Sequence, residues 1–126
     1  MDYSETVRHY FDEPGRAGNL KGTAGYCVSG SAGRESEGLR IWLAARIVDD
    51  HCVEACFRAY GCPYTIAMAA FAAEKTEGLD QASVGLAPLE AARELGLPDE
   101  KLACALCAED ALADLKTNWG AARKSM

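Results

Sequence analysis

Two cysteines of this chain stand at predicted helix starts. Cys62 ends an alternating apolar segment, residues 53–60, and precedes Pro63, a residue type favoured at the first position of a helix. Cys104 follows a second helix start, the run LPDEK at 97–101. The positive end of the helix macrodipole favours the thiolate, which is the form that binds metal or attacks sulfur. These positions therefore predict a metal or sulfur site.

The elements that must position Cys62 follow from the apolar periodicity of the first half of the chain. The expected order is a helix over 4–11, a loop over 12–22, a strand over 25–29, a turn or mobile loop over 29–33, and strands over 39–48 and 53–60 joined by a turn at Asp49-Asp50. The inner faces of the last two strands would carry Ile41, Leu43, Ala45 and Ile47, and Val53, Ala55, Phe57 and Ala59.

The second half of the chain has helical periodicity. We expect a helix from Pro63 that Gly78 closes, then one or two short helices within 79–96, and a last helix from Pro98 to about Lys116. The short helices would have an inner stripe of Leu86, Leu89, Ala92 and Leu95, and the tail 120–126 would fray. Strands first and helices afterwards predict an α+β fold, a small antiparallel three-stranded sheet with helices packed on one face, in one domain over 1–126. The sheet part would end near residue 60, and the helical part would cover about 63–118.

Composition and motif content argue against several classes of function. A net charge of −6 argues against nucleic-acid binding, and the longest apolar run, near 66–73, is far short of a membrane span. No secretory signal is visible, so the six cysteines are expected to be reduced thiols or ligands in a cytoplasmic protein. For Cys52 and Cys56 the alternative, a small buried apolar residue, is favoured. No nucleophile elbow, phosphate-binding glycine loop or dinucleotide fingerprint is present, so we do not expect an enzyme.

At these motifs the chain resembles the IscU/NifU N-terminal type of iron–sulfur cluster assembly scaffold. The residues that carry the resemblance are Tyr60-Gly61-Cys62, Leu97-Pro98 with Lys101, Cys104 with 108–111 (AEDA), and Tyr3-Ser4-Glu5, Val7, His9-Tyr10 and Pro14. The similarity extends from about Tyr3 to Leu115. It implies a three-stranded sheet with helices, iron–sulfur cluster binding through cysteines, a cysteine desulfurase as partner, and an Hsp70-type chaperone that binds at Leu97–Lys101.

The chain departs from the family pattern at three positions. Where the family has Ala-Cys-Gly-Asp, this chain has 31–34 (SAGR), so Ala32 replaces the first cluster cysteine and Arg34 replaces the aspartate. Where the family has His-Cys, this chain has Ala103-Cys104. Only Cys62 and Cys104 of the usual ligand set remain.

Neighbouring thiols are candidates for the missing ligands. Cys107 lies three residues after Cys104, on the same helix face, and in the family-like fold that helix start lies beside Cys62. Cys27 is a further candidate, because its strand leads toward the segment that carries the family's first ligand. The alternative for both is a side chain that packs or points elsewhere. A thiolate set of this kind suits an iron–sulfur cluster such as [2Fe–2S], with zinc as the alternative.

Arg34 would influence such a site through its charge. A guanidinium attracts a thiolate-ligated cluster and makes it less labile than an aspartate would. The alternative is an arginine that points into water or pairs with Glu35 or Glu37.

Three functions follow. The first is a divergent scaffold that assembles a cluster through Cys62 and Cys104, with a homodimer as one way to supply more thiols. The second is a non-assembling paralogue with a stable metal or cluster site, or with none, that acts as a regulatory or interaction module. The third is a plain interaction domain without metal.

Overall fold

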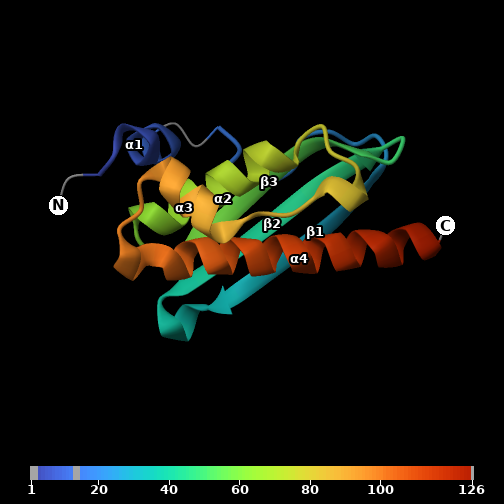
Figure 1. The fold of residues 1–126 in the computed structure, drawn as a ribbon. Helices are drawn as coiled ribbons and strands as arrows, with labels where there is room; N and C mark the ends of the chain where they lie inside the picture. The colour runs from blue at the N-terminus through green and yellow to red at the C-terminus, as the bar shows by residue number, and fades with distance from the viewer. Residues whose placement is uncertain (1–2, 13–14, 126) are drawn as a thin grey trace.

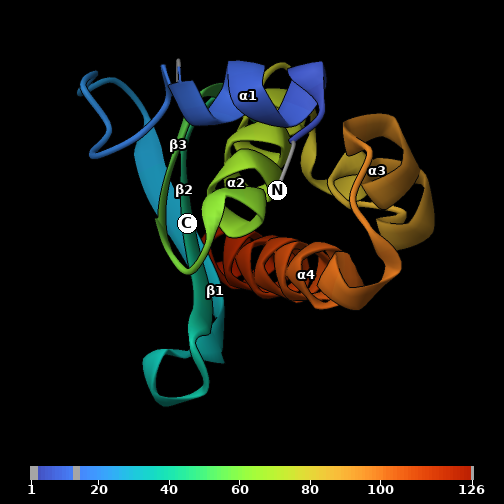
Figure 2. The ribbon, with the colours of Figure 1, turned by 90° about the vertical axis from the view of Figure 1, so that its left-hand side faces the viewer.

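The structure is a computed structural model that describes residues 3–12 and 15–125. The helices and strands follow one another as α1 (Glu5–Asp12), β1 (Tyr26–Arg34), β2 (Leu39–Val48), β3 (His51–Tyr60), α2 (Pro63–Thr76), α3 (Pro88–Leu95) and α4 (Leu102–Lys124). Short 3-10 turns lie at Glu35–Glu37, Gln81–Ser83 and Asp99–Lys101. All four helices lie on one side of the sheet, with α2 and α4 against it and α3 farther out (Figure 1, Figure 2). The predicted α+β fold, with helices on one face of a three-stranded antiparallel sheet, is confirmed.

The sheet has the order β1-β2-β3, and a bulge changes its register near the β2–β3 turn. Asp49 and Asp50 both have positive φ, as the predicted tight hairpin turn requires. The register shifts between Arg46, which faces Glu54, and Ile47, which faces Cys52. Val53 is thereby left on the outside, 47% exposed, and Cys52 points into the core. The predicted inward position of Val53 was wrong because a bulge reverses the alternation.

Strand β1 is longer than the sequence predicts. The segment 29–33 was expected to be a turn or mobile loop, but it pairs residue by residue with β2, from Ser29 opposite Ala44 to Gly33 opposite Arg40. Backbone pairing with β2 outweighs the low strand propensity of small residues. The reversal of the chain falls instead at 35–38, where Gly38 has φ of 79°.

The helices begin near the predicted residues, but two expectations about them were wrong. Ser4 caps α1, because its Oγ accepts a hydrogen bond from the Val7 N–H at 3.1 Å. Leu89, expected on the inner stripe of α3, is 64% exposed, and Ala91 is buried in its place. The tail does not fray at residue 120, because α4 continues to Lys124 with Trp119 fully buried. Within 3–12 and 15–125, no helix combines the length and apolar character needed to cross a membrane.

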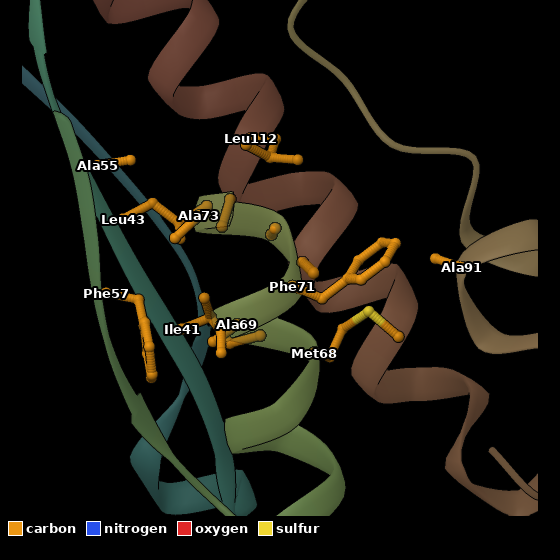
Figure 3. Close-up of a cluster of buried hydrophobic side chains, with 14 of the residues drawn as sticks. Ile41, Leu43, Ala55, Phe57, Met68, Ala69, Phe71, Ala73, Ala91 and Leu112 are labelled. Carbon is orange, nitrogen blue, oxygen red and sulfur yellow. The ribbon is translucent and has the colours of Figure 1, made fainter. Parts of the chain in front are cut away.

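The core lies between the sheet and the helix pair α2 and α4. Figure 3 shows Ile41 and Leu43 of β2 close to Ala69 and Ala73 of α2. Phe57 of β3 and Leu112 of α4 belong to the same buried cluster. The side of α2 that meets the sheet is rich in alanine, so its backbone approaches closely. Gly30 serves the same purpose on β1, since a Cβ there would lie 2.2 Å from the backbone nitrogen of Leu115 in α4.

Both outer strands of the sheet have partners along their edges. On β1, the Ser31 N–H donates to the Asp114 carboxylate at 3.0 Å, and the Asn118 amide donates to the Ser29 carbonyl at 2.7 Å. On β3, Phe57 exchanges backbone hydrogen bonds with the segment 16–18. Figure 2 shows this N-terminal segment on the side of the sheet away from the helices.

Candidate thiol site

Cys62 occupies the N-cap of α2, as the sequence predicts. Its backbone is extended (φ −82°, ψ 176°), and Pro63 is the first helical residue. Gly61 precedes it with φ of 154°, and a Cβ there would lie 2.4 Å from the Thr65 hydroxyl. The turn from β3 into α2 therefore requires glycine at 61 and holds Cys62 at the end of the helix.

Thr65 links the two cysteines at helix starts. Its hydroxyl lies 3.7 Å from the Cys62 Sγ and 3.4 Å from the Cys104 Sγ. Its side chain is 1% exposed, so the hydroxyl has little access to water. Cys62 and Cys104 thus form one connected group with Thr65 between them.

The two thiols of this group differ in pKa. Partial burial works to raise the pKa of Cys62, but the backbone N–H and the hydroxyl of Thr65 outweigh it and leave that pKa below the usual value. The positive charge of Lys101 contributes in the same direction. Burial raises the pKa of Cys104, and the neighbouring Cys62 raises it further. Cys62 is accordingly the thiol that ionises first and the better ligand or nucleophile.

Cys107 lies beside the position where the family's first cysteine is replaced. It is buried, and its Sγ donates a hydrogen bond of 3.5 Å to the backbone carbonyl of Ala32. Burial raises the pKa of its thiol. The structure thus brings Cys107 and Ala32 together on the side of β1 that faces α4. Cys107 lies three residues after Cys104 on that helix.

Cys27 is not part of this group. It is exposed on the outer face of β1, opposite Arg46, whereas β3 reaches the Cys62 turn at Tyr60, opposite Arg40. Six residues along β2 correspond to about 20 Å. Cys27 was predicted as a further ligand, and within one chain the structure separates it from the other three.

Two of the three substituted family positions, Arg34 and Ala103, are exposed. Arg34 ends β1 in an extended conformation, and the ion pair with Glu35 is formed by Arg40 at 4.0 Å, not by Arg34. Ala103 is exposed on the first turn of α4, next to Cys104. Across 3–12 and 15–125, no three His, Cys, Asp or Glu side chains already converge as a metal site.

Sequence reasoning missed two residues of the group. Thr65 was detectable as the one serine or threonine within the first turn after Cys62. Lys101 was noted only for the chaperone motif, yet its ammonium lies 5.9 Å from the centre of the Tyr64 ring and affects the pKa of Cys62. The ring of Tyr3 packs edge-on against Tyr64 beside this group, with the ring centres 4.8 Å apart.

Fold and site together define a class: a small α+β protein that carries a low-pKa thiol at a strand-to-helix turn, joined through a hydroxyl to a second thiol at the start of the last long helix. The comparisons with known proteins give the family. Residues 2–124 match the family described as NifU-like N terminal domain, and the chain belongs to it.

Relatives of known name agree with this assignment. The chain is 31% identical to the iron–sulfur cluster assembly protein IscU of Plasmodium falciparum, covering 94% of this chain and 74% of that protein. It is 32% identical to the scaffold protein IscU of Escherichia coli K12, with 89% of each covered.

Solved structures show the same fold. A scaffold of the SUF system from Fervidobacterium islandicum has a TM-score of 0.67 at 17% identity, covering 90% of this chain and 96% of that one. The N-terminal NifU-like protein of Brucella abortus has a TM-score of 0.64 at 14% identity, with 94% of each covered. The predicted family resemblance is confirmed.

Proposed function

We propose that this protein is a divergent iron–sulfur cluster scaffold that holds its cargo through Cys62 and Cys104. The observation that carries the proposal is the Cys62–Thr65–Cys104 group in a chain of this family. The pKa of the Cys62 thiol is lowered, which favours its thiolate. The Thr65 hydroxyl lies between this thiol and that of Cys104. Two thiols of one chain and two of a second chain could hold a [2Fe–2S] cluster between them, which makes a homodimer part of the proposal.

Cys107 is the next candidate ligand. The Cys107 thiol donates a hydrogen bond to the Ala32 carbonyl. Rotation of the Cys107 side chain would break this hydrogen bond and make the sulfur available to a metal. A third thiol of this kind would also suit zinc, which remains the alternative cargo. All six cysteines are free, as a reducing compartment such as the cytoplasm would keep them.

The proposed partners are a cysteine desulfurase, which would deliver sulfur to Cys62, and an Hsp70-type chaperone at Leu97–Lys101. A pocket beside the Leu97–Lys101 motif supports the proposed chaperone binding. This pocket of about 310 Å³ is lined by Leu89, Ala92, Arg93, Leu97, Pro98, Asp99 and Leu102. The outward position of Leu89 adds an apolar side chain to its rim.

The test is metal analysis of protein purified without oxygen. We expect iron with matching acid-labile sulfide in the wild type and neither in Cys62→Ser/Cys104→Ser. Cys27→Ser/Cys56→Ser removes two thiols from the outer face and is the matched control. Iron and sulfide that persist in the first variant would contradict the proposed ligands, and zinc without sulfide would contradict cluster assembly.

The second candidate function is a non-assembling paralogue that holds a stable site or acts as an interaction module. The exposed Arg34 and Ala103, together with Ala32, favour it, because the residues that make the family site transient are absent. Incubation of a reconstituted cluster with an apo-ferredoxin acceptor separates the two. Transfer supports the scaffold, and retention of the cluster supports the paralogue.

A further inference from the structure

The outer face of the sheet carries arginine and aromatic side chains at its Cys62 end. Trp42 of β2 pairs with Arg58 of β3, and Arg40 pairs with Tyr60, so the four form a cross-strand block that we call the arginine–aromatic block. The guanidinium carbons of Arg40 and Arg58 lie 4.5 Å and 5.6 Å from the centre of the Trp42 ring. Tyr60 is 50% exposed. The helices pack on the other face and leave this block uncovered (Figure 2).

The positive charge of this block is largely unneutralised. Arg46, on the same face farther along β2, is held by Glu54 at 3.1 Å in a mostly buried pair. Arg40 has only a 4.0 Å contact with an exposed Glu35 carboxylate, which screens little of its charge. Arg58 is exposed, and within residues 3–12 and 15–125 it forms no ion pair and contacts the Trp42 ring. Two weakly paired guanidinium groups thus lie at the same Trp42 ring in a chain of net charge −6.

A hollow adjoins the block on the same face. Its volume is about 350 Å³, and small side chains of the three strands form much of its floor, notably Ser29, Ala44 and Cys56. The segment 18–20 borders it, and Trp42 and Arg58 line it as well. A space of this size accepts an aliphatic side chain of a partner, next to the two guanidinium groups.

We propose that this face binds an acidic segment of a partner protein, with carboxylates on Arg40 and Arg58 and an apolar side chain in the hollow. Charge complementarity selects the occupant, because guanidinium groups bind carboxylates in a planar two-point geometry. Arginine, tryptophan and tyrosine are also the residue types that dominate binding energy at protein interfaces. The bound segment would lie beside Tyr60, two residues from Cys62. The proposal does not require that a cluster be bound.

The test uses apo-protein and a short fluorescein-labelled peptide that alternates Glu with Leu. Fluorescence anisotropy should show saturable binding that weakens as salt is raised. Arg58→Ala should weaken binding at least about tenfold, and Arg58→Glu should weaken it further. Arg8→Ala, an exposed arginine on α1, is the matched control and should bind as the wild type does. Unchanged melting temperatures will show that the variants fold.

Intrinsic fluorescence gives an independent readout. Trp42 borders the hollow and Trp119 is fully buried, so a bound peptide should change the accessible tryptophan signal and protect it from iodide. Equal binding by the Arg58 variants, equal binding of a Gln-Leu peptide, or no binding would overturn the proposal. Tighter binding of a single-stranded RNA oligonucleotide with the same arginine dependence would also overturn it, in favour of a nucleic-acid site.

Discussion

At the scale of single residues, the hydroxyl of Thr65 is one of the groups that set the charge state of Cys62. It contributes to lowering the pKa of Cys62, and it is the common neighbour of both thiols. A lower pKa means a larger thiolate fraction at neutral pH. The rate at which Cys62 reacts therefore reports how far the Thr65 hydroxyl stabilises its thiolate.

We predict that Thr65→Val raises the pKa of Cys62 and slows its alkylation by iodoacetamide several-fold at pH 7. Mass spectrometry of the Cys62 peptide across pH gives the rate and its midpoint. Thr76→Val is the matched control, because Thr76 is also buried in α2 but donates to the Ala72 carbonyl, away from the thiols. An unchanged rate profile in Thr65→Val would show that the hydroxyl does not stabilise the thiolate.

A second residue prediction concerns the lost ligand. Ala32 contacts Cys107, so Ala32→Cys adds a thiol on the side of β1 that faces α4. After anaerobic reconstitution, this variant should retain more iron and sulfide per chain than the wild type. Ser31→Cys places the same thiol opposite Trp42 on the outer face and should give no gain. Equal gains from both would mean that the position of the thiol is irrelevant.

At the scale of elements, the contact between β1 and α4 places the thiols of α4 against the sheet. Gly30 permits this contact, because an added Cβ would meet the backbone of α4 at Ala111 and Leu115. Backbone atoms of a packed helix cannot yield as a flexible side chain can. The close contact between β1 and α4 therefore requires a residue without a Cβ at position 30.

We predict that Gly30→Ala lowers the free energy of unfolding by about 1–3 kcal/mol through overpacking. Urea denaturation followed by circular dichroism measures it. Gly85→Ala is the control, because its backbone φ is not in the left-handed region and nothing lies within 4 Å of the added Cβ. Stability equal to the wild type in Gly30→Ala would show that α4 can move away from β1 at no cost.

The elements also show what sequence patterns can predict. The two-residue turn at 49–50 and the start of α2 at Pro63 were predictable, since local backbone chemistry determines both. The exposure of Val53 was not, because a bulge depends on how two strands pair. The helical state of 120–124 depends on Trp119 and its tertiary contacts, and the local small residues do not reveal it.

At the scale of the candidate site, the two cysteines at helix starts were predicted from local signals. The separation of Cys27 from them was not, because it depends on which face of β1 each residue occupies and on the length of that strand. The single-domain assignment stays a prediction, and the core that joins sheet and helices from Val7 to Trp119 is consistent with it.

The whole molecule should lose stability at high pH. Burial raises the pKa of Cys52 to about 11 from an unfolded value of 9.0. The folded state thus keeps a proton that the unfolded state releases, so this contribution is fully present below pH 9 and is lost as the pH rises toward 11. Near pH 10 the free energy of unfolding should fall by about 1.1 kcal/mol per pH unit for this thiol alone.

Urea denaturation between pH 8 and 10.5 tests this prediction. Cys52→Ala should show a shallower decline than the wild type, whatever its stability at pH 8. Cys27→Ala, which removes an exposed thiol, is the control and should decline as the wild type does. Parallel declines for all three proteins would assign the alkaline loss to other groups, such as Tyr10, whose pKa burial and Glu74 raise to about 12.

The hydrogen bonds between β1 and the side chains of Asp114 and Asn118, and those between β3 and the segment 16–18, have a consequence for behaviour at high concentration. Exposed strand edges are templates on which further chains can add and grow into fibrils. Here a helix side chain or an ordered loop occupies backbone groups on each edge, so the sheet cannot be lengthened by another molecule at these points. The protein is thereby protected against polymerising through these parts of its sheet.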